Sequence, residues 1–314
     1  MKRNLIMLFA TFSFVIPSLG ATAADRSTQQ AAGSNKRVTH TIQPGKATVA
    51  RNASSDYDGS GVLQLGSSKA LIINQETGET LYAKNTNTPT PIASVTKLMT
   101  AMVVLDAGLP MDEMITVSKE DIDTLKGTTS RLRVGISLPR SEMLRLALMS
   151  SENRAASALA RHYPGGLKAF LRDMNYKAYE LGMLNTRFVD STGLNSGNVS
   201  TAEDLVKMVR AAYEYEQIRL ESTTTSQEVA INGSRNPMQF INTNSLVRKG
   251  DWVIGLSKTG YISEAGRCLV MQAEIGGQPL IIVLLDSDGK MTRIGDANRI
   301  RKWIENSYMT ARMG

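Results

Sequence analysis

One stretch organises the chain, Pro91-Ile92-Ala93-Ser94-Val95-Thr96-Lys97-Leu98-Met99-Thr100, where a proline-containing loop turns into an apolar helical run. A serine and a lysine three residues apart, Ser94 and Lys97, share one face of a helix and come within hydrogen-bonding reach. Such a pair supplies a nucleophile and its base, and free N–H groups at the helix N-terminus help to hold an oxyanion beside Ser94. Because this spacing occurs by chance about once in a chain of ordinary composition, the function depends on the rest of the sequence.

The N-terminus indicates export. Lys2 and Arg3 precede an apolar stretch over residues 5–19, and small residues at 21–23 are typical of a cleavage site, which predicts a signal peptide over residues 1–23. Retention of this stretch as a membrane anchor is the alternative, although a bilayer span needs about 20 apolar residues. We therefore expect a periplasmic protein with at most loose membrane association.

The remainder divides by composition. Residues 24–59 are rich in Ser, Thr, Gln, Asn and Ala and show no hydrophobic period, which predicts a flexible leader. A folded domain is expected over residues 60–307, followed by a short tail over residues 308–314. Removing the signal peptide removes two positive charges and changes the net charge from +7 to +5, a modest excess without the aromatic and basic interleaving of a nucleic-acid binder.

Several chemistries are disfavoured by residue content. A single cysteine, Cys268, excludes an intramolecular disulfide and lies in an apolar strand pattern that indicates a core residue. The two histidines, His40 and His162, lack the paired spacing of zinc peptidases, so we expect no metal site, and the methionines fall at core spacings rather than in a cofactor box. A Ser-His-Asp triad would have to use His162, at a helix end before Pro164, which is a poor arrangement.

Hydrophobic periodicity predicts strands at both ends of the chain and helices between them. Strands are expected at 69–74, 80–84, 252–256, 268–275 and 280–285. Helices are expected after Lys97, from an N-cap at Ser141, over 155–160 and 167–181, after a capping box of Ser200 and Glu203, and after Asp296. This order favours one α/β domain whose largely antiparallel sheet joins the N- and C-terminal parts, flanked by helices with a helical subdomain.

Two further motifs follow Ser94 in order, Ser151-Glu152-Asn153 and Lys258-Thr259-Gly260. Together with Ser-x-x-Lys they form the set found in penicillin-binding proteins and class A β-lactamases. The second motif follows an apolar strand candidate and precedes a glycine-flanked turn. Similar spacings in loop-like sequence lack the required flanking elements: Ser287-Asp288-Gly289-Lys290, Ser196-Gly197-Asn198 and Ser234-Arg235-Asn236.

With these motifs, the chain resembles the low-molecular-mass penicillin-binding proteins over roughly residues 60–307, and most of all their D-alanyl-D-alanine endopeptidase subgroup. The segments that carry the resemblance are 94–100, 146–166, 181–194 and 258–270. It implies a β-lactamase/DD-peptidase-like fold and a serine peptidase that hydrolyses D-alanyl crosslinks in peptidoglycan stem peptides through an acyl-enzyme. It also implies covalent acylation by β-lactam antibiotics.

The resemblance implies a role for each motif residue. Ser94 would be the nucleophile and Lys97 its base, with a pKa lowered by burial and by the positive charge of Lys258. Ser151 would relay protons, and Asn153 would hold the substrate amide or Lys97. Substrate carboxylate binding falls to Lys258 and Thr259, while Gly260 would let the substrate backbone lie along the strand edge. The N–H groups of Ser94 and Tyr261 would form the oxyanion hole.

The sequence departs from the family pattern at two positions. Glu152 replaces the Gly or Asp that relatives often have, and Lys290 falls near the place of an arginine that helps related carboxypeptidases to bind a terminal carboxylate. Glu180 and Asn185 are separated by five residues, not the four of a class A β-lactamase, so we expect slow hydrolysis of a penicilloyl-enzyme. The alternatives are a DD-carboxypeptidase and a catalytically idle wall-binding scaffold.

Overall fold

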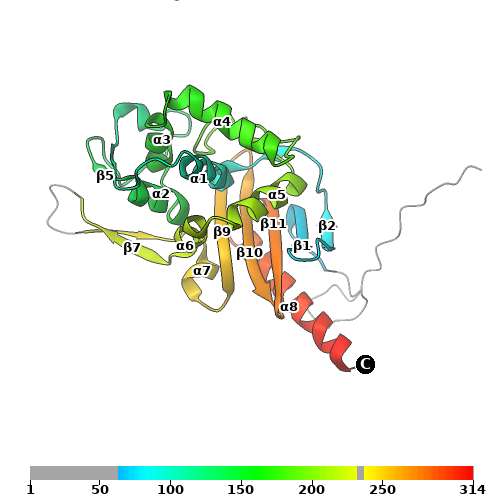
Figure 1. Ribbon diagram of the computed structural model, residues 1–314. Coiled ribbons are helices and arrows are strands. Elements are labelled where there is room, and N and C mark those ends of the chain that lie inside the picture. Colours follow the sequence, from blue (N-terminus) through cyan, green and yellow to red (C-terminus); the bar gives the residue numbers. More distant parts are fainter. Residues whose placement is uncertain (1–62, 232–236, 314) are drawn as a thin grey trace, which may run out of the picture. The chain divides into compact units, whose positions relative to one another are not determined.

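Strands from the two ends of the chain form one antiparallel sheet in the computed structural model, which describes residues 63–231 and 237–313 (Figure 1). Among these residues the sheet has five strands in the order β2-β1-β11-β10-β9, and each neighbouring pair is antiparallel. Its strands are β1 (Ser67–Asn74), β2 (Thr80–Lys84), β9 (Val253–Ile262), β10 (Gly266–Ile275) and β11 (Gln278–Ser287). Pairing of β1 with β11 confirms that the sheet joins the N- and C-terminal parts.

Both faces of this sheet are buried, and the alternation of side chains separates two cores. In β11, Ile281, Val283 and Leu285 belong to the larger core, on the face covered by most of the helices. The intervening Ile282 and Leu284 belong to a second core together with residues of the C-terminal helix. Because successive side chains of a strand point to opposite faces, a continuous apolar run is what a sheet covered on both sides requires.

Helices cover the two faces unequally. The C-terminal helix α8 packs on β10, β11 and β1, whereas α5 packs on the same sheet from the other face and α6 lies against β9 (Figure 1). The helix α1 is apolar on nearly every side and contacts α2, α3, α4 and α5, as expected for a central buried helix. The helices are α1 (Lys97–Asp106), α2 (Arg140–Met149), α3 (Asn153–Arg161), α4 (Gly166–Glu180), α5 (Ala202–Tyr213), α6 (Glu216–Thr223), α7 (Ser245–Lys249) and α8 (Thr292–Met313).

Short elements connect the helical part. Two-stranded pairs are formed by β3 (Thr90–Pro91) with β6 (Val199–Ser200), β4 (Met114–Thr116) with β5 (Ser137–Pro139), and β7 (Ser226–Val229) with β8 (Met238–Ile241). The 3₁₀ turns are η1 (Ala93–Thr96) and η2 (Lys119–Asp121). Within the described ranges, no helix combines the length and apolar content that crossing a bilayer requires.

Two predicted helix caps are wrong, by two residues for α2 and by one residue for α5. α2 begins at Arg140, after Pro139, because the N–H groups of Arg140 and Ser141 already donate to the carbonyls of Glu113 and Met111. These contacts satisfy donors of the first turn without a capping side chain. For α5 the cap is Thr201, whose hydroxyl accepts from the N–H of Asp204 at 3.1 Å.

The prediction that the Lys258-Thr259-Gly260 motif follows a strand is also inaccurate, because the motif lies inside β9. This strand continues past Leu256 as it pairs with β10, with Lys258 opposite Val270 and Tyr261 opposite Arg267. The predicted signal peptide and leader, residues 1–23 and 24–59, lie outside the described residues, as does the motif-like Ser234-Arg235-Asn236. α8 continues through residues 308–313, which the sequence assigned to a tail.

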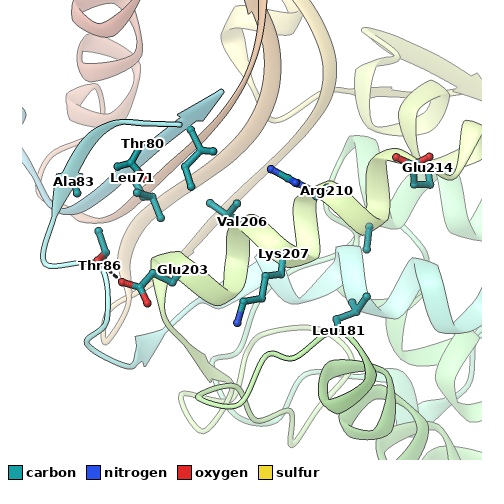
Figure 2. Close-up of a pocket in the computed structure, with 12 residues that line it drawn as sticks. Leu71, Thr80, Ala83, Thr86, Leu181, Glu203, Val206, Lys207, Arg210 and Glu214 are labelled. Carbon is teal, nitrogen blue, oxygen red and sulfur yellow. Dashed lines mark hydrogen bonds between the residues drawn. The ribbon is translucent and has the colours of Figure 1, made fainter. Parts of the chain in front are cut away.

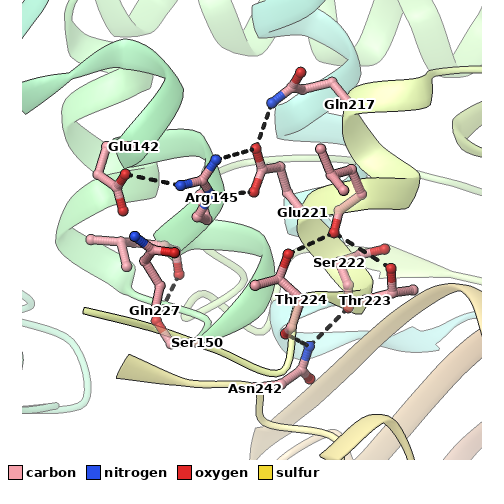
Figure 3. A network of polar contacts seen from close by, with 12 residues as sticks. Glu142, Arg145, Ser150, Gln217, Glu221, Ser222, Thr223, Thr224, Gln227 and Asn242 are labelled. Carbon is pink, nitrogen blue, oxygen red and sulfur yellow. Dashed lines mark hydrogen bonds and ion pairs between the residues drawn. The ribbon is translucent and has the colours of Figure 1, made fainter. Parts of the chain in front are cut away.

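A buried polar network ties α2 to α6 (Figure 3). Glu221 of α6 is fully buried and accepts from the Arg145 guanidinium of α2 and from Gln217. Asn242, after β8, donates to the backbone carbonyls of Ser222 and Thr224. Since α2 leads into the Ser151 turn and α6 packs on β9, this network fixes the distance between two of the three motifs.

Candidate active site

The Ser94 and Lys97 side chains meet as their spacing predicts. Lys97 Nζ lies 2.9 Å from Ser94 Oγ and donates to Asn153 Oδ1 at 2.7 Å and to the Thr192 carbonyl at 2.6 Å. Ser94 belongs to η1 and Lys97 opens α1, so the serine precedes the α-helix by one 3₁₀ turn. Lys97 is 1% exposed, whereas Ser94 is only half-buried and accessible to a substrate.

The third motif packs directly against η1. A Cβ atom added to Gly260 would lie 2.9 Å from the Ser94 nitrogen and 3.1 Å from the Ile92 carbonyl oxygen. The sequence prediction gave Gly260 the task of admitting the substrate backbone. In the structure, the missing side chain lets β9 approach η1, which brings the strand that carries Tyr261 close to Ser94, while its role toward a substrate stays a prediction.

The second motif faces the third across the site. Ser151 Oγ accepts from Lys258 Nζ at 3.0 Å, and Asn153 at the start of α3 donates through Nδ2 to Thr128 Oγ1 at 3.1 Å. Ser151 has a φ of +60°, in the left-handed region of the backbone that residues other than glycine rarely adopt. In the third motif, Thr259 Oγ1 donates to Thr243 Oγ1 at 2.7 Å. The structure therefore brings all three motifs together.

Burial controls the electrostatics of the two lysines. It lowers the pKa of Lys97 to about 7, although the nearby carboxylates of Asp190 and Glu152 act in the opposite direction. The pKa of Lys258 lies well below its ordinary value, again mainly through burial and then through the charges of Lys97 and Arg293. Burial, which the sequence analysis also named, is the largest cause of the low Lys97 pKa, and the repulsion between the two lysines disfavours the charged form of each.

A tight loop before β6 was missed as part of the site. The Asp190 carboxylate accepts from the N–H groups of Gly193, Leu194 and Asn195, at 2.8, 3.2 and 3.1 Å, and so turns the Thr192 carbonyl toward Lys97. Sequence reasoning gave this segment only as part of a family resemblance. Its signal was the Asp-Ser-Thr-Gly series, which is typical of a turn closed by side-chain hydrogen bonds.

A second missed residue is Arg293, at the start of α8. Its Nη1 lies 3.4 Å from the Gly260 carbonyl oxygen, and its buried Nε has no hydrogen-bond partner among the described residues. Lys290, which falls near the place of an arginine of related carboxypeptidases, is exposed in the turn before α8. Of these two cations, Arg293 is the one with a contact to β9.

The groove shown in Figure 2 lies elsewhere on the domain. It has a volume of about 680 Å³ between the β1–β2 hairpin and α5, and no motif residue lines it. Among the described residues, no three histidine, cysteine or carboxylate side chains are grouped as metal ligands.

The motif site combines a hydroxyl with a titratable amine beside it, and a second buried amine with a second hydroxyl facing it. Such a set can transfer an acyl group through a serine ester.

Comparisons with known proteins agree with this chemistry. The family model described as D-alanyl-D-alanine carboxypeptidase, peptidase family S11, matches residues 53–289. A D-alanyl-D-alanine endopeptidase of Pseudomonas aeruginosa is 48% identical over 248 residues, which cover 79% of this chain and 80% of that protein. The Escherichia coli protein of the same name is 48% identical over 242 residues, 77% of this chain and 78% of its own.

Solved structures confirm the expected fold. The crystal structure of the Streptomyces K15 DD-transpeptidase superposes with a TM-score of 0.71 at 31% identity, and covers 78% of this chain and 98% of that one.

Gly193 provides a test of how tightly the site is packed. Its φ is +82°, and an added Cβ would lie 1.9 Å from the Ala93 carbonyl oxygen, so Gly193→Ala should displace η1. Gly182→Ala is the matched control, because Gly182 has a φ of +69° and open space around it. We expect the control to lose about 1 kcal/mol of unfolding free energy in urea, and Gly193→Ala at least about 2 kcal/mol more. Equal losses of unfolding free energy in the two variants would show that η1 can move aside without a cost in stability.

Proposed function

The chain belongs to peptidase family S11, and on that premise we propose that it is a serine DD-endopeptidase that hydrolyses D-alanyl crosslinks in peptidoglycan through an acyl-enzyme on Ser94. The observation that carries this proposal is the contact of 2.9 Å between Ser94 Oγ and Lys97 Nζ, a buried amine with a pKa of about 7. At neutral pH this amine is unprotonated in about half of the molecules and so can accept the serine proton.

Acylation begins with attack of Ser94 Oγ on the carbonyl carbon of a D-alanyl residue, while the hydroxyl proton moves to Lys97 Nζ. The oxyanion accepts from the N–H groups of Ser94 and Tyr261, which the approach of β9 to η1 supports. When the C–N bond breaks, the leaving amine takes a proton from the Ser151 hydroxyl, and Lys258 replaces that proton across 3.0 Å. Water then attacks the ester carbonyl and gives a proton through Ser151 to the unprotonated Lys258. As the ester C–O bond breaks, Lys97 returns its proton to Ser94 Oγ, which restores the free hydroxyl and both lysines.

Binding of the leaving part of the substrate falls to β9 and α8. Lys258 and Thr259 contact a carboxylate there, and a bound carboxylate favours the ammonium form of Lys258. Arg293 adds a second cation beside Gly260, with its Nε still free of any partner in the described chain. Asn153 bonds the substrate amide through its Nδ2 and holds Lys97 through its Oδ1.

Endopeptidase action is favoured by the two relatives at 48% identity, both named D-alanyl-D-alanine endopeptidase. The carboxypeptidase alternative is supported by the description of the family model and by Arg293, which supplies a cation beside β9. A catalytically idle scaffold would have no use for a lysine kept titratable near pH 7. We propose action in the periplasm, after removal of the signal peptide over residues 1–23, on peptidoglycan stem peptides.

Labelling with a fluorescent penicillin tests the nucleophile. A β-lactam carbonyl attacked by Ser94 leaves a slowly hydrolysed ester, so wild type should carry a covalent label. Ser94→Ala should reduce the labelling rate by at least about a thousandfold while the protein keeps its circular dichroism spectrum. A label that persists in the folded variant would remove Ser94 from the mechanism, and an unlabelled wild type would favour the idle scaffold.

Substrate choice separates the two peptidase activities. With crosslinked dimeric muropeptides and pentapeptide monomers in one mixture, we expect dimers to be consumed at least about tenfold faster, a difference of about 1.4 kcal/mol in transition-state binding. Chromatography of the products follows both reactions, and Ser94→Ala is the blank. Faster release of terminal D-alanine would establish the carboxypeptidase alternative.

The acylation rate should depend on pH through Lys97. Since the unprotonated amine is the base and its pKa is about 7, the rate should rise about tenfold per unit below pH 6 and level off above pH 8. Penicillin acylation by stopped flow measures this profile. In Lys97→Arg, whose guanidinium stays charged, acylation should be lost at every pH. A wild-type rate that is constant from pH 5 to 8 would mean that another group takes the proton.

A further inference from the structure

Glu152, between Ser151 and Asn153, holds a buried carboxylate at the edge of the site. The residue is 7% exposed, and its Oε2 accepts from Ser130 Oγ at 2.6 Å. Its Oε1 accepts from Arg131 Nε and Nη2 at 3.4 and 3.3 Å. A buried carboxylate is tolerated when a cation and a hydroxyl donor compensate for lost water, and both are present here.

The cation in this cluster is itself fixed. Arg131 donates from Nη1 to the Gln239 carbonyl of β8 at 2.6 Å, and its guanidinium lies 4.0 Å from the centre of the Phe240 ring. The Glu152 carboxylate is thus attached, through one arginine, to a strand that does not belong to the motifs. Its other partner, Ser130, lies in the loop after η2.

Glu152 also adjoins the most strained backbone of the second motif. Ser151 has a φ of +60°, and such a conformation persists only where the surroundings fix it on both sides. On the preceding side, Ser150 Oγ donates to the Leu146 carbonyl at 3.0 Å. On the following side, the Glu152 N–H donates to the same carbonyl at 3.0 Å. The Glu152 side chain is fixed as well, because its carboxylate accepts from Ser130 Oγ.

We propose that Glu152 is a positioning residue for the acylation described above: its carboxylate, held by Ser130 and Arg131, fixes the strained turn that presents Ser151 and Asn153. This inference rests on the proposed function of Ser94. It assigns a role to the middle residue of the second motif.

The charge of Glu152 has a second effect, on the base. Lys97 is surrounded by charged groups from three segments: Glu152 before α3, Asp190 in the loop before β6 and Lys258 in β9. Glu152 raises the pKa of Lys97 against the effect of burial. Removing the negative charge should therefore lower that pKa and move the rise of the acylation rate to lower pH. If Arg131 is removed while the Glu152 carboxylate keeps its charge, the rise of the acylation rate should move to higher pH.

The experiment measures penicillin acylation of the full chain from pH 5 to 9 in wild type, Glu152→Gln, Arg131→Met and Glu305→Gln. For Glu152→Gln we expect a midpoint lower by about half a unit or more and a plateau rate reduced about tenfold, because a glutamine amide pairs poorly with Arg131. Arg131→Met should shift the midpoint upward, and it decides the matter if Glu152→Gln does not fold. Glu305→Gln is the matched control, since Glu305 also pairs with an arginine, Arg301 at 2.9 Å in α8, and takes part neither in the motif contacts nor in the network of Arg145 with Glu221.

Each outcome is decisive. A reduced plateau rate in Glu152→Gln, with opposite midpoint shifts in the two variants and a wild-type profile for the control, supports the positioning role. Midpoint shifts with a wild-type plateau rate would show an effect of charge alone and overturn the positioning role. Wild-type midpoints and plateau rates in both variants overturn it while the acylation of Ser94 stands. If the wild-type protein is not acylated at all, the proposed function and this inference fall together.

Discussion

The contact between Lys97 and Ser94 constrains the rest of the domain, because a lysine can serve as a base near pH 7 only if it is almost completely removed from water. Burial lowers its pKa to about 7, and two carboxylates limit the fall. Three oxygen atoms, from Ser94, Asn153 and Thr192, surround the amine. The apolar helix α1 supplies the burial. The start of α3 and the loop before β6 supply the partners Asn153 and Thr192, so the base depends on residues from three distant parts of the chain.

Unusual backbone conformations gather around this contact. Ala93, just before the proposed nucleophile, has a φ of +48°, and Ser151 has one of +60°. Neither conformation is favourable for a residue with a side chain, so each needs support from its surroundings. Gly193 and Gly260 give that support around Ala93 by admitting neighbouring backbone where any Cβ would collide. Around Ser151, it comes from the bonds of Ser150 and Glu152 to the Leu146 carbonyl. The network of Arg145 with Glu221, together with the two cores on either side of the sheet, keeps the supporting segments in place.

Much of this arrangement could be predicted from the sequence. Strands at both ends, a central apolar helix and three motifs in order were sufficient for the sheet, the fold and the proximity of Ser94, Lys97 and Lys258. Local sequence patterns gave wrong predictions where contacts between distant parts of the chain determine how a helix begins. Backbone carbonyls satisfied the first turn of α2, so a cap at Ser141 was unnecessary. The reach of Arg293 to β9 depends on how α8 begins, which no spacing reveals.

The central claim is that Lys97 loses its proton near neutral pH inside the folded domain. Its titration can be followed directly by NMR of protein labelled with ¹³C at the lysine ε carbon, with the resonance assigned by its absence in Lys97→Arg. A midpoint near pH 7 is the predicted result. A Lys97 resonance that titrates near pH 10.5, the ordinary value for a lysine, would contradict the account.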